Sequence, residues 1–353
     1  MRKPCIVHLL NSNKFAGAEN VACQIIEGTK DSYDCFYVSP AGTIKKTLDN
    51  KKINFYPIKS MNIFEIKKMI KVLKPTIIHA HDFRASIISA LSTSKIPIIS
   101  HLHNNSPWLK NYGIYSWVYL ISTIKYKKIL TVSNSIKQEY VFGRWIKSKI
   151  LMIGNPINIK YIQEKANQSN IKKAYDIIFI GRFMPEKDPI KFIEIISELV
   201  KTKQLKNLNC VMIGEGKLKK DCKQLIYNLN LKNNIDMVGF LDNPYIYLKN
   251  SKLLCMTSKW EGFGLVAIEA LALGVPVVAK PVGGLINIVD SKCGKLCNSN
   301  KDYIIELKKL LLNDNYRINK GKEAIIKSKE LNNYNSYIKI IKQLYKKLII
   351  REE

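Results

Sequence analysis

The sequence contains no apolar run long enough to cross a membrane, and its first apolar segment ends at Asn11 without the pattern of a signal peptide. Its eight cysteines lack the spacing of zinc ligands, and Cys293 and Cys297 have no second pair or histidine nearby. Internal repeats and low-complexity tracts are absent too, and glycine and proline are modest at 17 and 12 of 353 residues. These absences predict a globular cytoplasmic protein with reduced thiols, and its length fits two domains.

Acidic residues are scarce: 28 Asp and Glu stand against 57 Lys and Arg, which gives a formal net charge of +29. Such a charge favours anionic partners, namely nucleic acid, phosphorylated metabolites or an acidic membrane surface. The basic residues are scattered and form no dense block of arginine and aromatic side chains, which argues against nucleic acid. A compositional bias toward lysine, isoleucine and asparagine is the alternative explanation of the excess charge.

Two stretches combine apolar and basic residues in a way that suits a helix lying on a membrane surface. They are residues 63–74, with four lysines, and residues 108–128, rich in tryptophan, tyrosine and isoleucine. An ordinary amphipathic helix packed on its sheet is the alternative for each stretch. The sequence is therefore compatible with a peripheral position on the inner face of the cell membrane.

Short runs typical of β-strands recur along the chain, separated by stretches with apolar residues at helical spacing. The predicted strands are residues 5–10, 35–38, 76–80, 96–100, 129–132, 176–180, 210–213, 235–238, 253–256 and 275–279. Helical spacing is clear in residues 63–73 and 189–200. This alternation builds parallel sheets covered on both faces, so we predict an α/β fold with two Rossmann-like, doubly wound domains.

The domain boundary is expected where the GNPIN sequence and the polar residues 163–173 interrupt the pattern. This gives one domain over residues 1–157 and a second domain over residues 158–335. Residues 336–353 form a separate C-terminal segment that is helical by its period. That helix is expected either to cap the second domain or to cross back to the first.

The most specific local signal is SKWEGFGLVAIEALALGVPVVA, which follows a predicted strand. Gly262 and Gly264 let the backbone approach a ligand, and the N-terminus of the helix that follows favours phosphate. Glu261 and Glu269 are eight positions apart, a spacing of about 12 Å along a helix. Two such carboxylates can hydrogen-bond the hexose and the ribose of a nucleotide sugar. Two unrelated glutamates are the alternative, because the glycine pair alone is a weak signal.

EGFGLVAIE resembles the E-x7-E element of glycosyltransferase family 4, whose members have the GT-B fold. Other elements resemble those of the family in the same order along the chain: FAGAEN, HLHNN, GNPIN, GRFMPEKD, IGEG, VGFLDN and VGGLINIV. Ala16 stands where the first loop of the family has glycine, and Asn287 stands where its last loop often has glutamate. The resemblance covers almost the whole chain and implies two Rossmann-like domains that face an interdomain cleft. It implies that the N-terminal domain, residues 1–157, binds the acceptor and that the C-terminal domain, residues 158–335, binds the nucleotide sugar.

The resemblance assigns roles to the matching residues. Arg182 and Lys187 would neutralise the donor diphosphate and assist the departing nucleotide, as fixed cations do for a leaving group that gains charge. Glu261 would hold the transferred sugar and Glu269 the ribose. Phosphate or sugar would also be touched by the backbone N–H groups of Phe263, Gly264 and Leu265. A solvated basic turn is the alternative for Arg182 and Lys187.

His103 resembles the active-site histidine of the family, because it follows the predicted strand IPIIS by the usual offset; it would contact the transferred sugar near the reacting carbon. His101 would share a face with His103 if the strand continued that far. His79 and His81 repeat the arrangement at another strand end, so His79, His81 and His101 are candidates for the acceptor side. A hydrogen-bonded structural histidine is the alternative for each. Gly17 should open a helix whose N–H faces a phosphate or a sugar hydroxyl.

The resemblance implies a hexosyltransferase-like glycosyltransferase that retains the anomeric configuration, binds no metal and needs no cofactor. The sequence agrees in having no Asp-x-Asp metal pair and no carboxylate clearly placed as a nucleophile opposite a general acid. The expected donor is a nucleotide-diphosphate sugar, with a UDP-sugar first. The expected acceptor is a glycan or a lipid-linked glycan, in the biosynthesis of a bacterial surface polysaccharide.

Two other functions stay open at this point. One is a different nucleotide-sugar enzyme on the same fold, such as an epimerase or a phosphorylase. The other is a non-enzymatic protein that binds nucleotides or nucleic acid, which only the charge suggests. Product analysis with a labelled donor separates the enzymes, and Glu261→Gln should abolish transfer without changing retention on nucleic acid.

Overall fold

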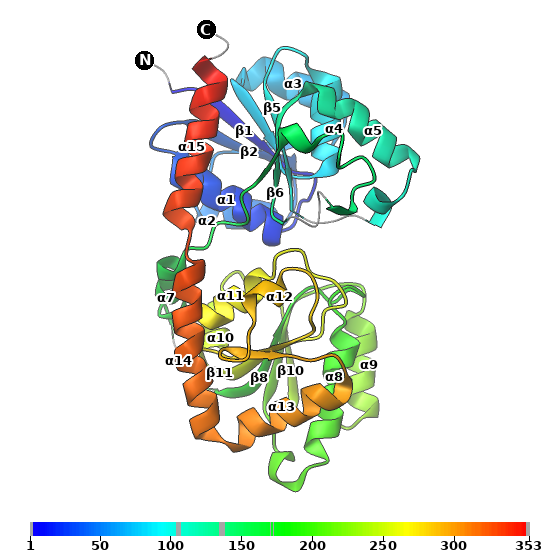
Figure 1. The fold of residues 1–353 in the computed structure, drawn as a ribbon, viewed down its shortest axis with the longest axis vertical. Helices are drawn as coiled ribbons and strands as arrows, with labels where there is room; N and C mark the ends of the chain where they lie inside the picture. The colour runs from blue at the N-terminus through cyan, green and yellow to red at the C-terminus, as the bar shows by residue number, and fades with distance from the viewer. Residues whose placement is uncertain (1–2, 104–106, 134–137, 170, 172, 351–353) are drawn as a thin grey trace. The chain divides into compact units, whose positions relative to one another are not determined.

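The computed structural model describes residues 3–103, 107–133, 138–169, 171 and 173–350. Asn104 and Asn105 of the HLHNN sequence lie outside the described residues. The chain divides into two compact units, one formed by Met1–Pro156 with Asn333–Glu353 and the other by Ile157–Asn332. In each unit helices cover a parallel sheet, as Figure 1 shows.

The first unit is built on a seven-stranded sheet of parallel neighbours in the order β3-β2-β1-β4-β5-β6-β7. The strands are β1 (Cys5–Leu9), β2 (Asp34–Pro40), β3 (Phe55–Ile58), β4 (Ile77–Ala80), β5 (Ile98–Leu102), β6 (Tyr126–Thr131) and β7 (Ile150–Met152). The order reverses between β1 and β4. Doubly wound sheets bind their ligands beyond the carboxyl ends of the strands at such a reversal.

The helices of this unit include the last helix of the chain, which packs beside the first (Figure 1). They are α1 (Gly17–Thr29), α2 (Ile44–Asn50), α3 (Ile63–Leu73), α4 (Phe83–Ser92), α5 (Ile114–Ser122) and α15 (Tyr334–Ile350). Local signals fix their ends: the side chain of Asn62 accepts a hydrogen bond from the backbone N–H of Glu65 at 3.0 Å and caps α3. Helix α15 is held against α1 where the hydroxyl of Tyr334 donates to the carbonyl of Gln24 at 3.1 Å.

The second unit repeats this plan with a six-stranded sheet in the order β10-β9-β8-β11-β12-β13, again with parallel neighbours. Its strands are β8 (Tyr175–Ile180), β9 (Cys210–Ile213), β10 (Ile235–Gly239), β11 (Ser251–Met256), β12 (Val277–Ala279) and β13 (Gly294–Leu296). Its helices are α7 (Ile159–Ala166), α8 (Pro189–Val200), α9 (Lys219–Asn228), α10 (Tyr245–Lys249), α11 (Leu265–Ala272), α12 (Leu285–Ile288), α13 (Asn300–Leu312) and α14 (Asp314–Leu331). The order reverses between β8 and β11.

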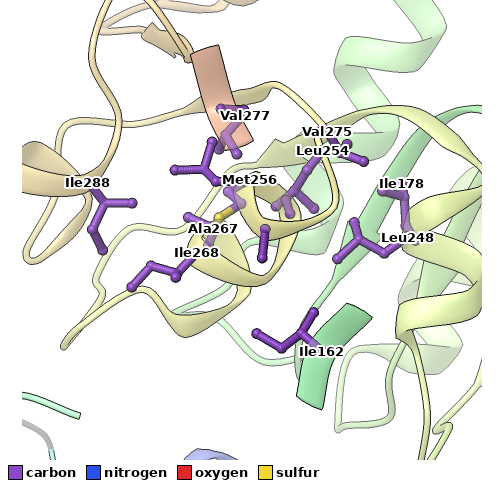
Figure 2. Close-up of a cluster of buried hydrophobic side chains, with 14 of the residues drawn as sticks. Ile162, Ile178, Leu248, Leu254, Met256, Ala267, Ile268, Val275, Val277 and Ile288 are labelled. Atoms are coloured by element: carbon purple, nitrogen blue, oxygen red, sulfur yellow. The ribbon is translucent and has the colours of Figure 1, made fainter. Parts of the chain in front are cut away.

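Two apolar cores cover the faces of the second sheet. Successive strand residues alternate between them, so Leu254 belongs to one core and Leu253 to the other. The first core is closed by α7, α10, α11, α12 and α14, and the second by α8, α9 and α13. Figure 2 shows Ala267 and Ile268 of α11 among the side chains of the first core, near Met256 of β11. This packing fixes α11, and with it the position of Glu269, against the sheet.

The sequence predicts the central strands well and misses three strands, β3, β7 and β13, which lie at the edges of the two sheets. Strand β3 contains Pro57, and β7 and β13 have three residues each. Edge strands tolerate proline and need little apolar sequence, so their signal is weak. The helices predicted over residues 63–73 and 189–200 match α3 and α8. No helix among the described residues is both long and apolar enough to span a bilayer.

Candidate active site

Three loops of the second unit meet at the carboxyl edge of its sheet, at the reversal between β8 and β11. The loop after β11 joins the loop after β8, because the backbone N–H of Lys259 donates to the carbonyl of Glu186 at 2.9 Å. The loop after β12 joins the loop after β11, because the backbone N–H of Gly284 donates to the carbonyl of Gly262 at 3.1 Å. The sequence elements GRFMPEKD, EGFG and VGGLINIV are therefore brought into one place by the fold.

Two glycines allow this close approach of the loops. Gly283 has φ 53°, and a Cβ at this position would lie 1.7 Å from the carbonyl oxygen of Glu261. Gly214, which follows β9, has φ 146°, and a Cβ there would lie 1.9 Å from the carbonyl oxygen of Gly181. Both positions combine a left-handed φ with backbone contact, so only glycine fits them.

Lys187 and Glu261 form an ion pair across the two loops. The Nζ of Lys187 is hydrogen-bonded to Oε1 of Glu261, and the hydroxyl of Ser258 donates to the same oxygen at 3.0 Å. The carboxylate is largely buried, so its charge is compensated by a cation and a hydroxyl, as buried charges require. Thr257 holds the loop of Lys187 in place by donating to the carbonyl of Asp188 at 2.8 Å.

Arg182 lies in the same loop as Lys187 but remains more accessible. Its guanidinium Nη2 pairs with Oε1 of Glu186 at 2.7 Å, and its side chain is 58% exposed. Exposed ion pairs of this kind contribute little to stability. The guanidinium can therefore turn to a phosphate group without disturbing the fold.

Glu269 lies within α11 and has a different partner from Glu261. Its Oε1 accepts a hydrogen bond from the hydroxyl of Tyr245 on α10 at 3.1 Å. Burial raises the pKa of Glu269 to about 7, and the hydrogen bond from Tyr245 opposes this rise. The two glutamates do not share a helix as their spacing suggested, because α11 begins at Leu265 and Glu261 precedes it in the turn.

The N-terminus of α11 points its first backbone N–H groups at this edge of the unit. Gly264 is the N-cap residue, with φ 89°, and no side chain caps the helix there. The first N–H groups of a helix have no partner within the helix and carry the positive end of its dipole. Phe263, Gly264 and Leu265 thus supply the kind of backbone donors that bind phosphate.

All five histidines of the chain gather on one face of the first sheet, at its reversal between β1 and β4. His8 on β1 lies opposite His79 on β4 in the strand register. Side chains two positions apart on an extended chain share a face, which places His81 beside His79 and His103 beside His101. The first four histidines are at most 1% exposed. None of His79, His81 and His101 can touch an acceptor in this conformation.

Hydrogen bonds join the rings of three histidines into a first row. Nδ1 of His8 lies 3.0 Å from Nε2 of His81, and Nδ1 of His81 lies 3.0 Å from Nε2 of His103. Burial lowers the pKa of His8 and of His103 to about 3. Burial also lowers the pKa of His81 well below its ordinary range. The row is therefore made of neutral imidazoles.

The second row connects the other two histidines to the C-terminal helix. The hydroxyl of Tyr345 on α15 lies 2.6 Å from Nδ1 of His79, and Nε2 of His79 lies 3.2 Å from Nδ1 of His101. Burial, followed by neighbouring histidines, lowers the pKa of His79 and of His101 well below the ordinary range. Helix α15 is thus tied into the cluster by a polar contact as well as by packing.

The cluster has the composition of a metal site but not the orientation of one. The ligand nitrogens of His8, His79 and His81, and those of His81, His101 and His103, lie within 4.8 Å of one another. Neutral imidazoles are common metal ligands. In each group, however, two rings already share a hydrogen bond, which a metal ion would have to displace. The geometry favours hydrogen-bonded imidazoles.

Gly17 opens α1, as the sequence predicted, and the chain reaches it from the carboxyl end of β1. A Cβ added at Gly17 would meet no atom within 4 Å, so the space beside it is open. Sequence reasoning missed His8 and Tyr345, which meet the other histidines only through the strand register and the return of α15. The one available signal was that His8, like His79, lies in a predicted strand.

Comparisons with known proteins identify the family of the chain. Residues 162–330 match the family model described as glycosyl transferases group 1, and residues 17–161 match the one described as glycosyltransferase family 4. The chain is 30% identical to an uncharacterized glycosyltransferase of Methanocaldococcus jannaschii over 261 residues, which cover 70% of each chain. For another glycosyltransferase of that organism the match covers 67% of this chain and 66% of the relative.

Two further relatives are named for their activities. The UDP-Gal:alpha-D-GlcNAc-diphosphoundecaprenol alpha-1,3-galactosyltransferase of Escherichia coli is 23% identical, and the match covers 85% of this chain and 82% of the relative. A Campylobacter jejuni alpha-1,4-N-acetyl-D-galactosaminyltransferase, named as acting on an undecaprenol-linked glycan, is 27% identical over 72% of this chain and 70% of the relative.

Solved structures share the fold. The Anabaena protein HepE in complex with UDP-glucose has a TM-score of 0.83 at 17% identity, covering 97% of this chain and 99% of that one. A glycosyltransferase from Rickettsia africae has a TM-score of 0.74 at 20% identity, covering 99% of both chains. The fold is that of the GT-B glycosyltransferases, as the sequence predicted. Within this class, the chain belongs to glycosyltransferase family 4 and is a glycosyltransferase.

Proposed function

We propose that the protein is a retaining glycosyltransferase that moves a hexose or a related sugar from a nucleotide-diphosphate sugar to a lipid-linked glycan. The observation that carries the proposal is the meeting of Lys187, Glu261 and the N-terminus of α11 at one sheet edge. The relatives that act on undecaprenol-linked acceptors support the acceptor class, and a surface polysaccharide is the expected product. The structures in complex with UDP and UDP-glucose support a UDP-sugar as the donor.

The diphosphate of the donor is expected to bind beside the Lys187–Glu261 pair. Lys187 and Arg182 supply positive charge, and the first N–H groups of α11 supply backbone donors. Charge builds up on the diphosphate as the sugar–phosphate bond breaks, so cations that are already in place stabilise the transition state. Glu261 holds the transferred sugar while it keeps Lys187 oriented, and Glu269 accepts a hydrogen bond from the ribose.

Retention follows from a transfer on one face of the sugar. The leaving phosphate takes the proton of the acceptor hydroxyl as the new glycosidic bond forms and the bond to phosphate breaks. No metal is needed for this step, because Lys187 and Arg182 carry the compensating charge. A β-linked product from an α-linked donor would contradict this part of the proposal.

The test is a transfer assay with labelled UDP-sugars and an undecaprenyl-diphosphate sugar, with the product linkage assigned by NMR. Glu261→Gln should lower kcat/KM by about a hundredfold or more, because it removes the carboxylate that orients Lys187 and the sugar. Glu198→Gln makes the same chemical change on the exposed side of α8 and should leave the rate unchanged. Equal activity of the two variants would defeat the proposed role of Glu261. An epimerised donor or a sugar phosphate as product would indicate a different nucleotide-sugar enzyme.

We propose that the acceptor lies at a membrane surface and that helix α5 contacts this surface. Its residues at helical spacing form an apolar stripe that is exposed: Ile114, Trp117, Val118 and Ile121. The opposite side, with Ser116, Tyr119 and Ser122, faces inward. This reverses the usual amphipathic order, in which the apolar stripe faces the core. Contiguous exposed apolar surface of this kind marks a binding face.

The charge around α5 favours an anionic bilayer as its partner. The segment that follows β6 packs against α5, with the rings of Phe142 and Trp117 4.4 Å apart, and adds the exposed Trp145. Exposed basic side chains lie in the neighbouring segments: Lys125, Lys127, Arg144 and Lys147. Apolar and aromatic side chains with a basic surround suit insertion into the headgroup region of an acidic membrane.

Vesicle sedimentation tests this location. Binding to vesicles with phosphatidylglycerol should exceed binding to pure phosphatidylcholine and should fall with salt. Replacing Trp117 and Ile121 by serine should weaken binding about tenfold or more, because two inserted side chains are lost. Ile305→Ser with Leu312→Ser removes two exposed apolar residues of α13 and is the matched control. Equal binding to both vesicle types, or equal loss in both variants, would contradict the proposal.

A further inference from the structure

The carboxylate of Glu261 uses only one of its two oxygens for contacts within the described part of the chain. Oε1 accepts hydrogen bonds from the Nζ of Lys187 and from the hydroxyl of Ser258, the latter at 3.0 Å. Oε2 has no hydrogen-bond partner among the described residues, although the side chain is only 7% exposed. An oxygen of an ionised carboxylate that is largely removed from water needs a donor. A hydroxyl group of a ligand can supply this donor.

Two donors on one oxygen fix the orientation of the carboxylate. The terminal torsion of a glutamate side chain is broad, so the carboxylate turns easily. Lys187 alone would not prevent this, because its ammonium is a point charge on a flexible stem and can pair with either oxygen. Ser258 lies three residues before Glu261 in the loop after β11 and is 2% exposed, so its hydroxyl has little freedom. The hydroxyl therefore selects which oxygen is bound to the protein and which is left for a ligand.

The residue before Ser258 holds the other member of the ion pair. The hydroxyl of Thr257 lies 3.2 Å from the carbonyl oxygen of Lys187 and 2.8 Å from that of Asp188. Asp188 is the N-cap of α8 and has φ 48°, a left-handed conformation that is uncommon outside glycine. Such a conformation persists only where the surrounding structure holds it. Two consecutive hydroxyls after β11 thus fix both sides of the Lys187–Glu261 pair.

We propose that Ser258 is a positioning residue, which holds Glu261 with Oε1 bound to the protein and Oε2 free to accept a hydrogen bond from the transferred sugar. This inference rests on the proposed function, in which Glu261 holds the sugar, and it identifies the atom that does so. The sugar hydroxyl can bind Oε2 without displacing Lys187, whose partner is the other oxygen. This part of the site is preformed, which avoids the loss of side-chain freedom that ordering during binding would require.

A purely structural role of Ser258 makes a different prediction. A hydroxyl that only compensates the buried charge of Glu261 contributes to the stability of the loop. Its loss would lower the melting temperature and weaken the binding of the nucleotide and of the nucleotide sugar alike. A hydroxyl that orients Oε2 affects the sugar, so its loss weakens binding of the nucleotide sugar and leaves binding of the nucleotide unchanged.

The experiment measures the Kd of UDP and the Kd of UDP-glucose by calorimetry on the full chain. Ser258→Ala should raise the Kd of UDP-glucose about tenfold, as expected for the loss of a hydrogen bond to a charged group, and should change the Kd of UDP by less than about twofold. Ser251→Ala is the matched control. Ser251 is the first residue of β11, is also buried, and donates to the carbonyl of Tyr247 at 2.7 Å. Its replacement should change neither Kd.

Glu261→Gln tests whether Ser258 acts through Glu261. The amide oxygen of the glutamine can still accept from Lys187 and Ser258, which puts its NH2 group in place of Oε2 and removes the acceptor for the sugar. In this background Ser258→Ala should change the Kd of UDP-glucose by less than about twofold, because two residues that act through one contact are not additive.

Four results would overturn the proposal. They are an unchanged Kd of UDP-glucose in Ser258→Ala, an equal rise for UDP and UDP-glucose, the same rise in the Glu261→Gln background, and an equal effect of Ser251→Ala. If Ser258→Ala does not fold, Ser258→Cys keeps a side chain of similar size with a weaker donor. It should raise the Kd of UDP-glucose about threefold or more at an unchanged Kd of UDP, and no rise would overturn the proposal.

These binding measurements need neither an acceptor nor turnover, which separates the proposal from the proposed function. A protein in which Ser258 and Glu261 are coupled toward UDP-glucose, but which glycosylates no acceptor, would refute the proposed function alone. Transfer that depends on Glu261 but is unchanged in Ser258→Ala would refute the positioning role alone.

Discussion

Acidification from pH 7.5 to pH 5.5 should strongly destabilise the first unit, because all five histidines of the chain lie there in their neutral form, four of them at most 1% exposed. The pKa of His8 and of His103 is about 3, and the pKa of the other three lies well below 6.5, with burial as the main cause. As pH falls through 6.5, the histidines of the unfolded chain bind protons, whereas those of the folded chain stay neutral. The free energy of unfolding therefore falls with pH.

The size of this effect follows from the number of buried rings. At pH 5.5, one unit below the ordinary pKa, keeping one imidazole neutral costs about 1.4 kcal/mol relative to pH 7.5. Five rings give about 7 kcal/mol, which is comparable with the whole stability of a typical domain, about 5–15 kcal/mol. The second unit contains no histidine, and the pKa of Glu269, raised by burial to about 7, makes that unit more stable as pH falls.

Tryptophan fluorescence during urea unfolding can measure this on the first unit. Replacing Trp260 by phenylalanine leaves three tryptophans, all in the first unit: Trp108, Trp117 and Trp145. The free energy of unfolding is then compared at pH 7.5, 6.5 and 5.5, and proton uptake on unfolding is measured by calorimetry in two buffers. At pH 5.5 the uptake should be between about four and five protons.

The reasoning would be refuted by a loss below about 2 kcal/mol between pH 7.5 and pH 5.5, or by an uptake below about two protons. Either result would mean that the folded cluster retains protons, for example as an imidazolium shared between two rings. His8→Leu is the control for the pH dependence of the free energy of unfolding. It should reduce the pH-dependent part of the loss by about a fifth, whatever it does to the stability at pH 7.5.

Three further outcomes are expected. The Kd for UDP-glucose should rise about tenfold from pH 8 to pH 6. Glu269 has a pKa of about 7, and its ionised form is the better hydrogen-bond acceptor for the ribose; a Kd independent of pH would contradict this role. Tyr245→Phe should move that transition to higher pH, because it removes a hydrogen bond that lowers the pKa of Glu269, and an unmoved midpoint in the same titration would argue against the bond. Gly283→Ala should unfold the second unit, because its methyl group collides with the carbonyl of Glu261, whereas Gly17→Ala is the matched control and should leave the melting temperature unchanged, because its methyl group enters open space.

Much of the fold could be predicted from the sequence, because its causes are local. Buried central strands need continuous apolar runs, and residues 210–213 were placed without error as β9. The cap at Asn62 and the period of residues 63–73 likewise define α3. The ordered family elements, from FAGAEN to VGGLINIV, indicated the GT-B class, which the matched families and the solved structures confirm.

The sequence also indicated which residues of the second unit to look at, but not how they pair. The spacing of Glu261 and Glu269 suggested one shared helix. The fold instead starts α11 at Leu265 and gives the two carboxylates different partners, Lys187 and Tyr245. These pairs join loops and helices far apart along the chain, and such contacts depend on the order of strands in the sheet, which no local pattern encodes.

The histidine cluster is the clearest case of what only the tertiary structure decided. Period-two alternation in a strand predicts that His101 and His103 share a face. It does not predict that β1, β4 and β5 are neighbours, that their register brings His8 to His81, or that α15 returns to put Tyr345 on His79. Residue types and local periods are properties of the sequence, whereas burial, hydrogen-bond partners and hence the pKa of each imidazole arise when distant segments pack.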